Sequence, residues 1–212
     1  MVNKLFTVVI ISYQEPTLLR AVDSVLAQDY SCLELVIYDN HSCDFNAEDI
    51  EKYICTHRKE NLLNFCIKKE EHHIGAGKIL EKAAAITSGD YITFMPDTSF
   101  LACPDAISSI VKVIQTEQAE ILVCREAKIG QDYKNIAEIP TESDFQKVKN
   151  LNSAELRRML FSHPDNVWVA SNAVYWQRSA FENVGGFDSS FAYEAAEELV
   201  LRASVSESKL HF

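Results

Sequence analysis

Residues 5 to 44 read LFTVVIISYQEPTLLRAVDSVLAQDYSCLELVIYDNHSCD, and this pattern predicts a strand, a helix and a second strand that ends in a carboxylate. Val8 to Ile11 form a short β-branched run without alternation, as expected of a strand buried on both faces of a parallel sheet. The run stops at Ser12 to Pro16, and Pro16 fits the first turn of a helix. Apolar residues then recur on one helical face, at Leu18, Leu19, Val22, Val25 and Leu26.

The second strand is predicted over Leu33 to Tyr38, and it brings Asp39 to its carboxyl end. A helical crossover joins the two strands, so they are expected to be parallel neighbours in one sheet. Ligands of open parallel sheets bind beyond the carboxyl ends of the strands. The sequence therefore predicts a binding site formed by the turn after the first strand and by Asp39.

The chain continues to alternate between strand and helix, which implies an α/β fold with a mainly parallel central sheet in a three-layer, Rossmann-like arrangement. Asn46 is placed to cap the next helix, and Gly75-Ala76-Gly77 precede another. The expected helices are Ala47 to His57, Lys78 to Thr87 and one that Pro104 opens, and the expected strands are Leu63 to Ile67, Tyr91 to Met95 and Ala119 to Cys124.

The last third of the chain is less regular. From Arg125 to about Leu151 the sequence is polar, and a loop of this length in a compact domain is usually functional or mobile. We expect a helix over Ser153 to Phe161, an extended segment over Val167 to Trp176, a helical turn over Arg178 to Val184 and a last helix from Ala195 to about Ser204.

Composition sets limits on function. The chain has 212 residues, 47% of them hydrophobic, which is enough for one substantial core. The net charge of −11 argues against a nucleic-acid partner. No apolar stretch approaches the roughly 18 residues of a membrane span, and no signal-peptide cleavage site follows the amino terminus. Six scattered cysteines without metal-ligand spacing indicate reduced, structural thiols, so we expect a cytoplasmic protein.

Four segments together resemble the motifs of a known family: VVIISYQEPTLLRAVDSVLAQDY, LELVIYDNHSCD, GDYITFMPD and FENVGGFD. Their order and separations resemble family-two glycosyltransferases of the A fold, which transfer a sugar from a nucleotide-diphosphate donor. The resemblance covers nearly the whole chain and implies one domain over residues 1–212. Residues 1–100 would be its nucleotide-binding half, and residues 101–212 its acceptor-side half, which is truncated if further elements follow the last helix.

The resemblance assigns the nucleoside to Ser12, Tyr13, Glu15 and Asp39, where the family's usual second acid is replaced by Asn40. A carboxylate such as Asp39 can accept the ring N–H groups of uracil or guanine, and an aromatic ring such as Tyr13 offers a stacking face. The alternative is that Asp39 is a strand-end turn residue and Tyr13 a packed aromatic.

For the diphosphate, the family's Asp-any-Asp motif, which binds Mg²⁺ or Mn²⁺, falls on Pro96, Asp97 and Thr98. Only Asp97 can supply a carboxylate to the divalent cation. The family's basic contact is also missing, since its Arg-Asn pair falls on Leu80 and Glu81, and Lys78 is the nearby replacement. The run Glu70-Glu71-His72-His73 looks like a zinc cluster, but a solvated charge run is the preferred interpretation.

An inverting transferase needs a carboxylate base to take the proton of the acceptor hydroxyl, and the family places a Glu-Asp pair at the start of the last helix. Alignment on Leu199 and Arg202 puts Ala195 and Ala196 at this pair. A shift of two residues puts Glu197 and Glu198 there instead. The alternative is that these two glutamates are solvated and favoured only by the helix dipole.

Two hypotheses follow. The first is an inverting glycosyltransferase that acts on a saccharide or lipid-linked acceptor in cell-surface polysaccharide biosynthesis, in the cytoplasm or bound peripherally to the inner face of the membrane. The second is a noncatalytic domain of the same fold that keeps nucleotide binding or a protein-interaction role. A dinucleotide-binding dehydrogenase is a distant third, because no Gly-x-Gly-x-x-Gly follows the first strand.

Overall fold

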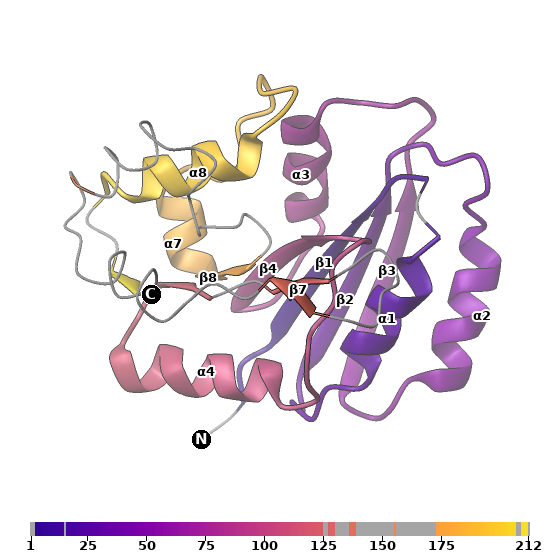
Figure 1. Cartoon of the computed structure of the whole chain (residues 1–212), viewed down its shortest axis with the longest axis horizontal. Helices are drawn as coiled ribbons and strands as arrows, with labels where there is room; N and C mark the ends of the chain where they lie inside the picture. The colour runs from indigo at the N-terminus through magenta and orange to yellow at the C-terminus, as the bar shows by residue number, and fades with distance from the viewer. Residues whose placement is uncertain are drawn as a thin grey trace.

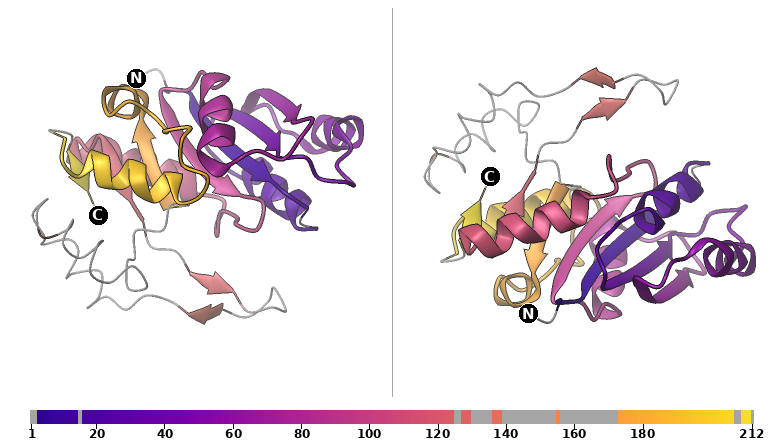
Figure 2. Two further views of the ribbon diagram at one scale, coloured as in Figure 1. Left: turned by 90° about the horizontal axis from the view of Figure 1, so that it is seen from above. Right: turned by 90° about the horizontal axis from the view of Figure 1, so that it is seen from below.

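The computed structural model describes residues 3–14, 16–124, 127–129, 136–138, 155, 173–206 and 209–211. These residues form a seven-stranded sheet in the order β3-β2-β1-β4-β8-β5-β9 (Figure 1). Its strands are β1 (Phe6–Ser12), β2 (Leu33–Asp39), β3 (Leu62–Lys69), β4 (Tyr91–Pro96), β5 (Ile121–Val123), β8 (Val174–Gln177) and β9 (Leu210–His211). A separate pair, β6 (Lys128–Ile129) and β7 (Ile136–Glu138), lies apart from this sheet in both views of Figure 2.

The four strands of the amino-terminal half are parallel, as the sequence predicts. β1 pairs with β2 on one side and β4 on the other, and β2 pairs with β3. The register aligns Ser12 with Asp39, so the last residues of β1 and β2 lie side by side at one edge of the sheet. β8 is antiparallel to both β4 and β5, which makes the sheet mixed but mainly parallel.

Helices cover both faces of the sheet, so the predicted three-layer α/β architecture is confirmed (Figures 1 and 2). One core cluster lies beneath α1 (Leu18–Leu26), α2 (Ala47–His57) and α4 (Ala106–Glu117). The other lies beneath α3 (Ala76–Ala85), α7 (Arg178–Asn183) and α8 (Ala195–Ala203). β1 is buried on both faces, because Phe6, Val8 and Ile10 enter the first cluster and Val9 enters the second. Its apolar sequence therefore does not alternate with polar residues.

Several element ends differ from the sequence-based expectation. β3 continues to Lys69 instead of ending at Ile67, because it pairs with β2 along its whole length. The charged loop that follows, residues 70–75, therefore begins at Glu70. α3 begins at Ala76 rather than Lys78, because the Ala76 and Gly77 N–H groups donate to the carbonyls of Ala192 and Phe191, both at 2.9 Å. α1 and α4 each begin two residues after the proline expected to open them. Asn46 caps α2 as predicted, accepting from the N–H groups of Glu48 and Asp49.

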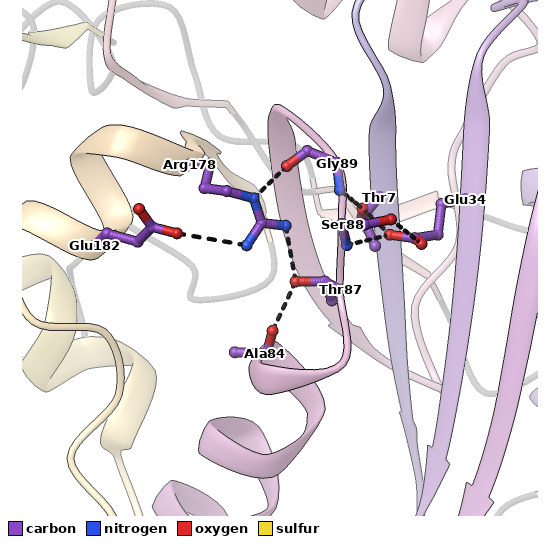
Figure 3. Close-up of polar contacts among 8 residues, drawn as sticks. All are labelled: Thr7, Glu34, Ala84, Thr87, Ser88, Gly89, Arg178 and Glu182. Carbon is purple, nitrogen blue, oxygen red and sulfur yellow. Dashed lines mark hydrogen bonds and ion pairs between the residues drawn. The ribbon is translucent and has the colours of Figure 1, made fainter.

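A buried carboxylate ties the strands together at the amino end of the sheet (Figure 3). Glu34 of β2 is only 4% exposed, and its oxygens accept four hydrogen bonds from residues of three other segments. The donors are the Thr7 hydroxyl (2.5 Å), the Ser88 N–H (2.7 Å), the Ser88 hydroxyl (2.5 Å) and the Asn64 amide (3.0 Å). Arg178 reaches the same turn and donates to the Gly89 carbonyl at 2.6 Å. The network therefore fixes the turn between α3 and β4 against the sheet.

Parts of the expected pattern lie outside the described residues. These are most of the predicted polar loop over residues 125–151, the predicted helix over residues 153–161 apart from residue 155, and the first part of the predicted extended segment, whose end forms β8. Within the described ranges, no helix is long and apolar enough to cross a membrane. All six cysteines are free thiols, and burial raises the pKa of the Cys124 thiol to about 11.

Candidate nucleotide-sugar site

Four of the predicted residues meet where β1, β2 and β4 end. The Ser12 hydroxyl and the Tyr13 N–H both donate to Oδ2 of Asp97, at 2.8 and 3.1 Å. Asp39 lies opposite Ser12 in the register, and the N–H that follows it, of Asn40, donates to the Ser12 carbonyl at 2.8 Å. Ser12, Asp39 and Asp97 are all buried. The fold therefore gathers polar groups 85 residues apart in the sequence at one edge of the sheet.

Asp39 holds a tight turn. Its Oδ2 accepts the Ser42 N–H at 2.8 Å, and its Oδ1 accepts the Ser42 hydroxyl. The Ser42 hydroxyl oxygen in turn accepts the Gln14 N–H at 2.8 Å, which links this turn to the one after β1. Asp39 has no exposed surface, so a base N–H group reaches it only after the 40–42 turn moves. Each carboxylate oxygen still has a second lone pair for such a donor.

Tyr13 presents an accessible aromatic ring beside this turn. Tyr13 is 43% exposed, and its ring packs at a tilt against His73, with the ring centroids 4.6 Å apart. Nδ1 of His73 lies 3.4 Å from the Asn40 carbonyl, which steadies the imidazole. One part of the Tyr13 ring is therefore packed, and the rest is open for stacking.

Asn40, which replaces the family's second acid, has a structural role at the site that its place in the sequence does not predict. Its amide pairs with the backbone of Ile74: Nδ2 donates to the carbonyl and Oδ1 accepts the N–H, both at 2.9 Å. An aspartate could accept but not donate, so it could not make this pair. The replacement of the family's second acid by Asn40 thus coincides with a clamp on the 70–75 loop.

We expect Asn40→Asp to destabilise the protein by about 1–3 kcal/mol, because the Ile74 carbonyl loses its donor and faces a carboxylate in a buried setting. Urea unfolding measures the change. Asn3→Asp is the matched control, since Asn3 is exposed and its partner, the Ser31 hydroxyl, can donate to a carboxylate instead. Equal stability of Asn40→Asp and the parent protein would show that the clamp is unimportant.

The residues around Asp97 offer little to a metal ion. One Asp97 oxygen already accepts two hydrogen bonds, and the neighbours are Pro96 and the exposed Thr98. Among the described residues, no group of three or more His, Cys, Asp and Glu side chains is arranged to hold a metal. Because Mg²⁺ in phosphate sites is usually held by one or two carboxylates plus substrate oxygens, the residues fit a divalent cation only together with a diphosphate.

The charged loop after β3 is partly held in place by the contacts of Glu70. Glu70 accepts Lys82 Nζ at 2.7 and 2.9 Å and the Tyr38 hydroxyl at 2.7 Å, and the Lys82 ammonium holds the pKa of Glu70 below its usual value. Burial, together with the Glu70 hydrogen bond, raises the pKa of Tyr38 to about 12. Lys78 is exposed on the first turn of α3 and forms no ion pair with the described carboxylates. It therefore remains available to an anionic ligand.

The two glutamates of α8 have different surroundings. Glu198 accepts hydrogen bonds from Nε of Arg202 at 2.7 Å and from its Nη2 at 2.5 Å. The same guanidinium also donates to the carbonyls of Val184 and Gly186. Glu198 thus holds the arginine that fixes the Gly185-Gly186 turn, where both glycines have positive φ. Glu197 is exposed, and its side chain has no hydrogen bond or ion pair with the described residues. Glu15, the remaining predicted site residue, lies outside the described residues.

Comparison with known proteins identifies the class. The profile described as glycosyl transferase family 2 matches residues 7–179, so the chain belongs to this family of enzymes, as the sequence motifs predict. A curated relative is the processive diacylglycerol beta-glycosyltransferase of Mycoplasma genitalium, 23% identical over 172 residues, which cover 79% of this chain and 50% of the relative.

Solved structures share the fold. The structure of S. aureus TarS residues 1–349 in complex with UDP-GlcNAc aligns over 98% of this chain and 55% of that 1–349 chain, with a TM-score of 0.73 and 15% identity. The mannosyltransferase PcManGT from Pyrobaculum calidifontis, in complex with GDP-Man and Mn²⁺, aligns over 99% of this chain and 54% of PcManGT, with a TM-score of 0.72 and 16% identity. The chain spans about half the length of these relatives, and the GT-A fold is confirmed.

Proposed function

We propose that the protein transfers a sugar from a nucleotide-diphosphate donor to an acceptor hydroxyl with inversion at the anomeric carbon. The observation that carries this proposal is the meeting of Ser12, Asp39 and Asp97 beyond the carboxyl ends of three adjacent parallel strands. Family membership supports it, as do the related folds in complex with UDP-GlcNAc and GDP-Man. A role in polysaccharide assembly at the cytoplasmic side of a membrane is part of the proposal.

The proposed donor site divides into two parts. The base stacks on the open part of Tyr13 and donates to Asp39, with Ser12 and Glu15 completing the nucleoside site. The diphosphate lies toward Asp97, with Lys78 supplying positive charge from α3. A divalent cation held by Asp97 and the diphosphate would neutralise charge on the leaving group.

The proposed base is a glutamate of α8, and the contacts favour Glu197 over Glu198. The acceptor oxygen attacks the anomeric carbon as its proton passes to the carboxylate, and the bond between that carbon and the diphosphate breaks. Both oxygens of Glu198 already accept hydrogen bonds from Arg202, so this carboxylate is engaged in holding the arginine. Glu197 is exposed and lacks such a partner among the described side chains, so its oxygens are open to an acceptor hydroxyl.

We expect Asp39→Ala to weaken UDP or GDP binding at least about tenfold, because a hydrogen bond to a charged group contributes roughly 1.5–3 kcal/mol. Loss of the hydrogen bonds to Ser42 would loosen the same turn and add to the effect. Isothermal titration calorimetry gives the affinities, and Asp23→Ala on α1 is a control carboxylate away from the site. Unchanged affinity in Asp39→Ala would remove this residue from the nucleoside site.

Mn²⁺ alone should bind no tighter than about millimolar, because a single carboxylate flanked by proline and threonine makes a weak site. The diphosphate brings further oxygen ligands, so Mn²⁺ and UDP together should bind more tightly than either alone. Calorimetry of Mn²⁺ with and without UDP tests this. A tight Mn²⁺ site in the ligand-free protein would contradict the proposed position of the cation.

The second candidate is a noncatalytic domain that only binds a nucleotide or a protein partner. It is favoured by the single carboxylate at the cation position and by the pairing of Glu198 with Arg202. A panel of UDP- and GDP-sugars separates the two candidates, with release of the nucleoside diphosphate as the measurement. Transfer or hydrolysis of any donor supports the enzyme. No turnover of the whole panel, with nucleotide binding intact, would make the noncatalytic domain the better candidate.

A further inference from the structure

The segment between α7 and α8 carries two exposed aromatic side chains. Tyr193 is 82% exposed, more than any other large hydrophobic side chain in the described ranges, and Phe191 is 39% exposed. Both lie in Asp188 to Glu194, which we call the 188–194 segment. Exposing a tyrosine ring to this degree leaves a large apolar face in water, and such faces on a surface loop often serve binding.

The 188–194 segment is fixed at both ends and in the middle. Before it, Phe187 is buried against Phe94, with the ring centroids 4.7 Å apart. After it, α8 begins at Ala195, and the preceding residue, Glu194, adopts a left-handed conformation with φ of 57°. In the middle, the carbonyls of Phe191 and Ala192 accept the first N–H groups of α3. The two aromatic residues are therefore presented by an anchored backbone.

The contact with α3 is close and specific. A Cβ atom at Gly77 would lie 2.2 Å from the Asp188 carbonyl oxygen and 2.7 Å from that of Phe191, so only glycine fits here. At Gly75, a Cβ atom would lie 3.1 Å from the Ala192 Cα. The segment therefore lies directly on the start of α3, as Figure 1 also shows.

This position is next to the proposed donor site. Gly75 is two residues beyond His73, whose ring packs against Tyr13, and Ala192, which touches Gly75, immediately precedes Tyr193. Lys78, at the same end of α3, is proposed to face the diphosphate. An acceptor seated on the 188–194 segment would therefore lie beside the proposed donor site, and α8, which carries Glu197, follows the segment directly.

We propose that Tyr193, with Phe191, forms a stacking surface for a pyranose ring of a saccharide acceptor. The inference rests on the proposed transferase function and names its acceptor class. The C–H groups on one face of a pyranose ring pack against an aromatic face, and its hydroxyls then point to the rim. Exposed hydroxyls and carboxylates, such as Ser189 and Glu194, are placed on the same segment to receive them. A tyrosine suits this role because its ring is rigid and its hydroxyl stays in water.

Charge favours a saccharide over a membrane surface at this segment. Exposed aromatic residues can also enter a lipid interface, but membrane-binding segments then usually carry Lys or Arg. The exposed charged groups of the segment and of the first turn of α8 are Asp188, Glu194 and Glu197, with Lys78 of α3 as a single nearby cation, and the whole chain has a net charge of −11. An anionic leaflet would repel the acidic groups, whereas a neutral sugar would not.

The test uses the methyl pyranosides of glucose, galactose, mannose and N-acetylglucosamine, observed by saturation-transfer NMR with UDP and Mn²⁺ present. We expect at least one pyranoside to bind the parent protein and Tyr193→Ala to weaken that binding about five- to tenfold. Tyr193→Phe should bind like the parent, because it keeps the ring. Val205→Ala, which truncates another exposed apolar side chain after α8, should also bind like the parent.

Three results would overturn the inference. No pyranoside binds the parent, or Tyr193→Ala binds the pyranoside as well as the parent does. The third is that the parent sediments with phosphatidylglycerol vesicles and Tyr193→Ala does not. Thermal unfolding shows whether each variant is folded, and UDP calorimetry shows whether its donor site is intact. Together they distinguish failure of the acceptor inference from failure of the proposed function. If UDP binds the parent and Tyr193→Ala equally while pyranoside binding is unaffected, only the acceptor inference fails. If UDP and GDP do not bind the parent at all, the proposed function itself fails.

Discussion

Glu197→Gln should lower sugar transfer by about a hundred- to ten-thousand-fold, the usual contribution of a general base, and leave UDP affinity nearly unchanged. A base acts on the acceptor proton in the transition state and not on the bound nucleotide, so the loss appears in kcat rather than in donor binding. Neutralising both Glu197 and Glu198 should abolish transfer. Initial rates of nucleotide release and calorimetry of UDP give the two quantities.

Glu198→Gln is the matched comparison, because it makes the same chemical change one residue away. Its expected effect is on stability, a loss of about 1–2 kcal/mol, since Arg202 loses a charged partner while it still holds the carbonyls of Val184 and Gly186. Transfer by the double variant at the rate of the parent would exclude both glutamates. A large rate loss in Glu198→Gln alone, at unchanged stability, would reverse the preference for Glu197.

Glu34→Ala should destabilise the protein by about 2–4 kcal/mol, because four hydrogen bonds end on this buried carboxylate. Removing it leaves the Ser88 N–H without an acceptor and releases the turn that joins α3 to β4 (Figure 3). Urea unfolding at neutral pH measures the loss, and the unfolding midpoint should fall accordingly.

Glu34→Gln separates the hydrogen bonds from the negative charge. A glutamine keeps one oxygen for Thr7 and the Ser88 N–H, and its NH₂ group can donate to a turned Asn64 amide and to the Ser88 hydroxyl. We therefore expect a much smaller loss of stability than with alanine. Equal losses in the two variants would mean that the charge itself, and not the hydrogen-bond network, stabilises the turn.

The parallel half of the sheet was predictable because its pattern is local. An apolar β-branched run, a proline, an amphipathic helix and a second apolar run determine β1, α1 and β2, and the crossover rule supplies their direction. β8 has only four residues, and nothing in VYWQ indicates that it pairs antiparallel with β4 and β5. So short a run does not determine the direction of the strand from its sequence.

Within the candidate site, the predicted residues at strand ends could be found because strand ends of one sheet meet at one edge. The Asn40 clamp on Ile74 could not be found, since a side-chain pair with a backbone 34 residues away leaves no trace in the spacing. The pairing of Glu198 with Arg202, in contrast, does leave a trace in the spacing of the sequence. Acid and arginine four residues apart on a helix commonly pair, and this spacing distinguishes Glu198 from Glu197.

A crystal structure of the protein soaked with UDP, GDP and Mn²⁺ would test the proposed donor site most directly. We expect a nucleotide beyond the carboxyl ends of β1 and β2, with its base on Tyr13 and hydrogen-bonded to Asp39 after the 40–42 turn has moved. Its diphosphate should lie beside Asp97, with any Mn²⁺ bridging the two. A nucleotide bound elsewhere on the protein, or bound at this edge with Asp39 still covered and Asp97 uninvolved, would contradict the proposed site.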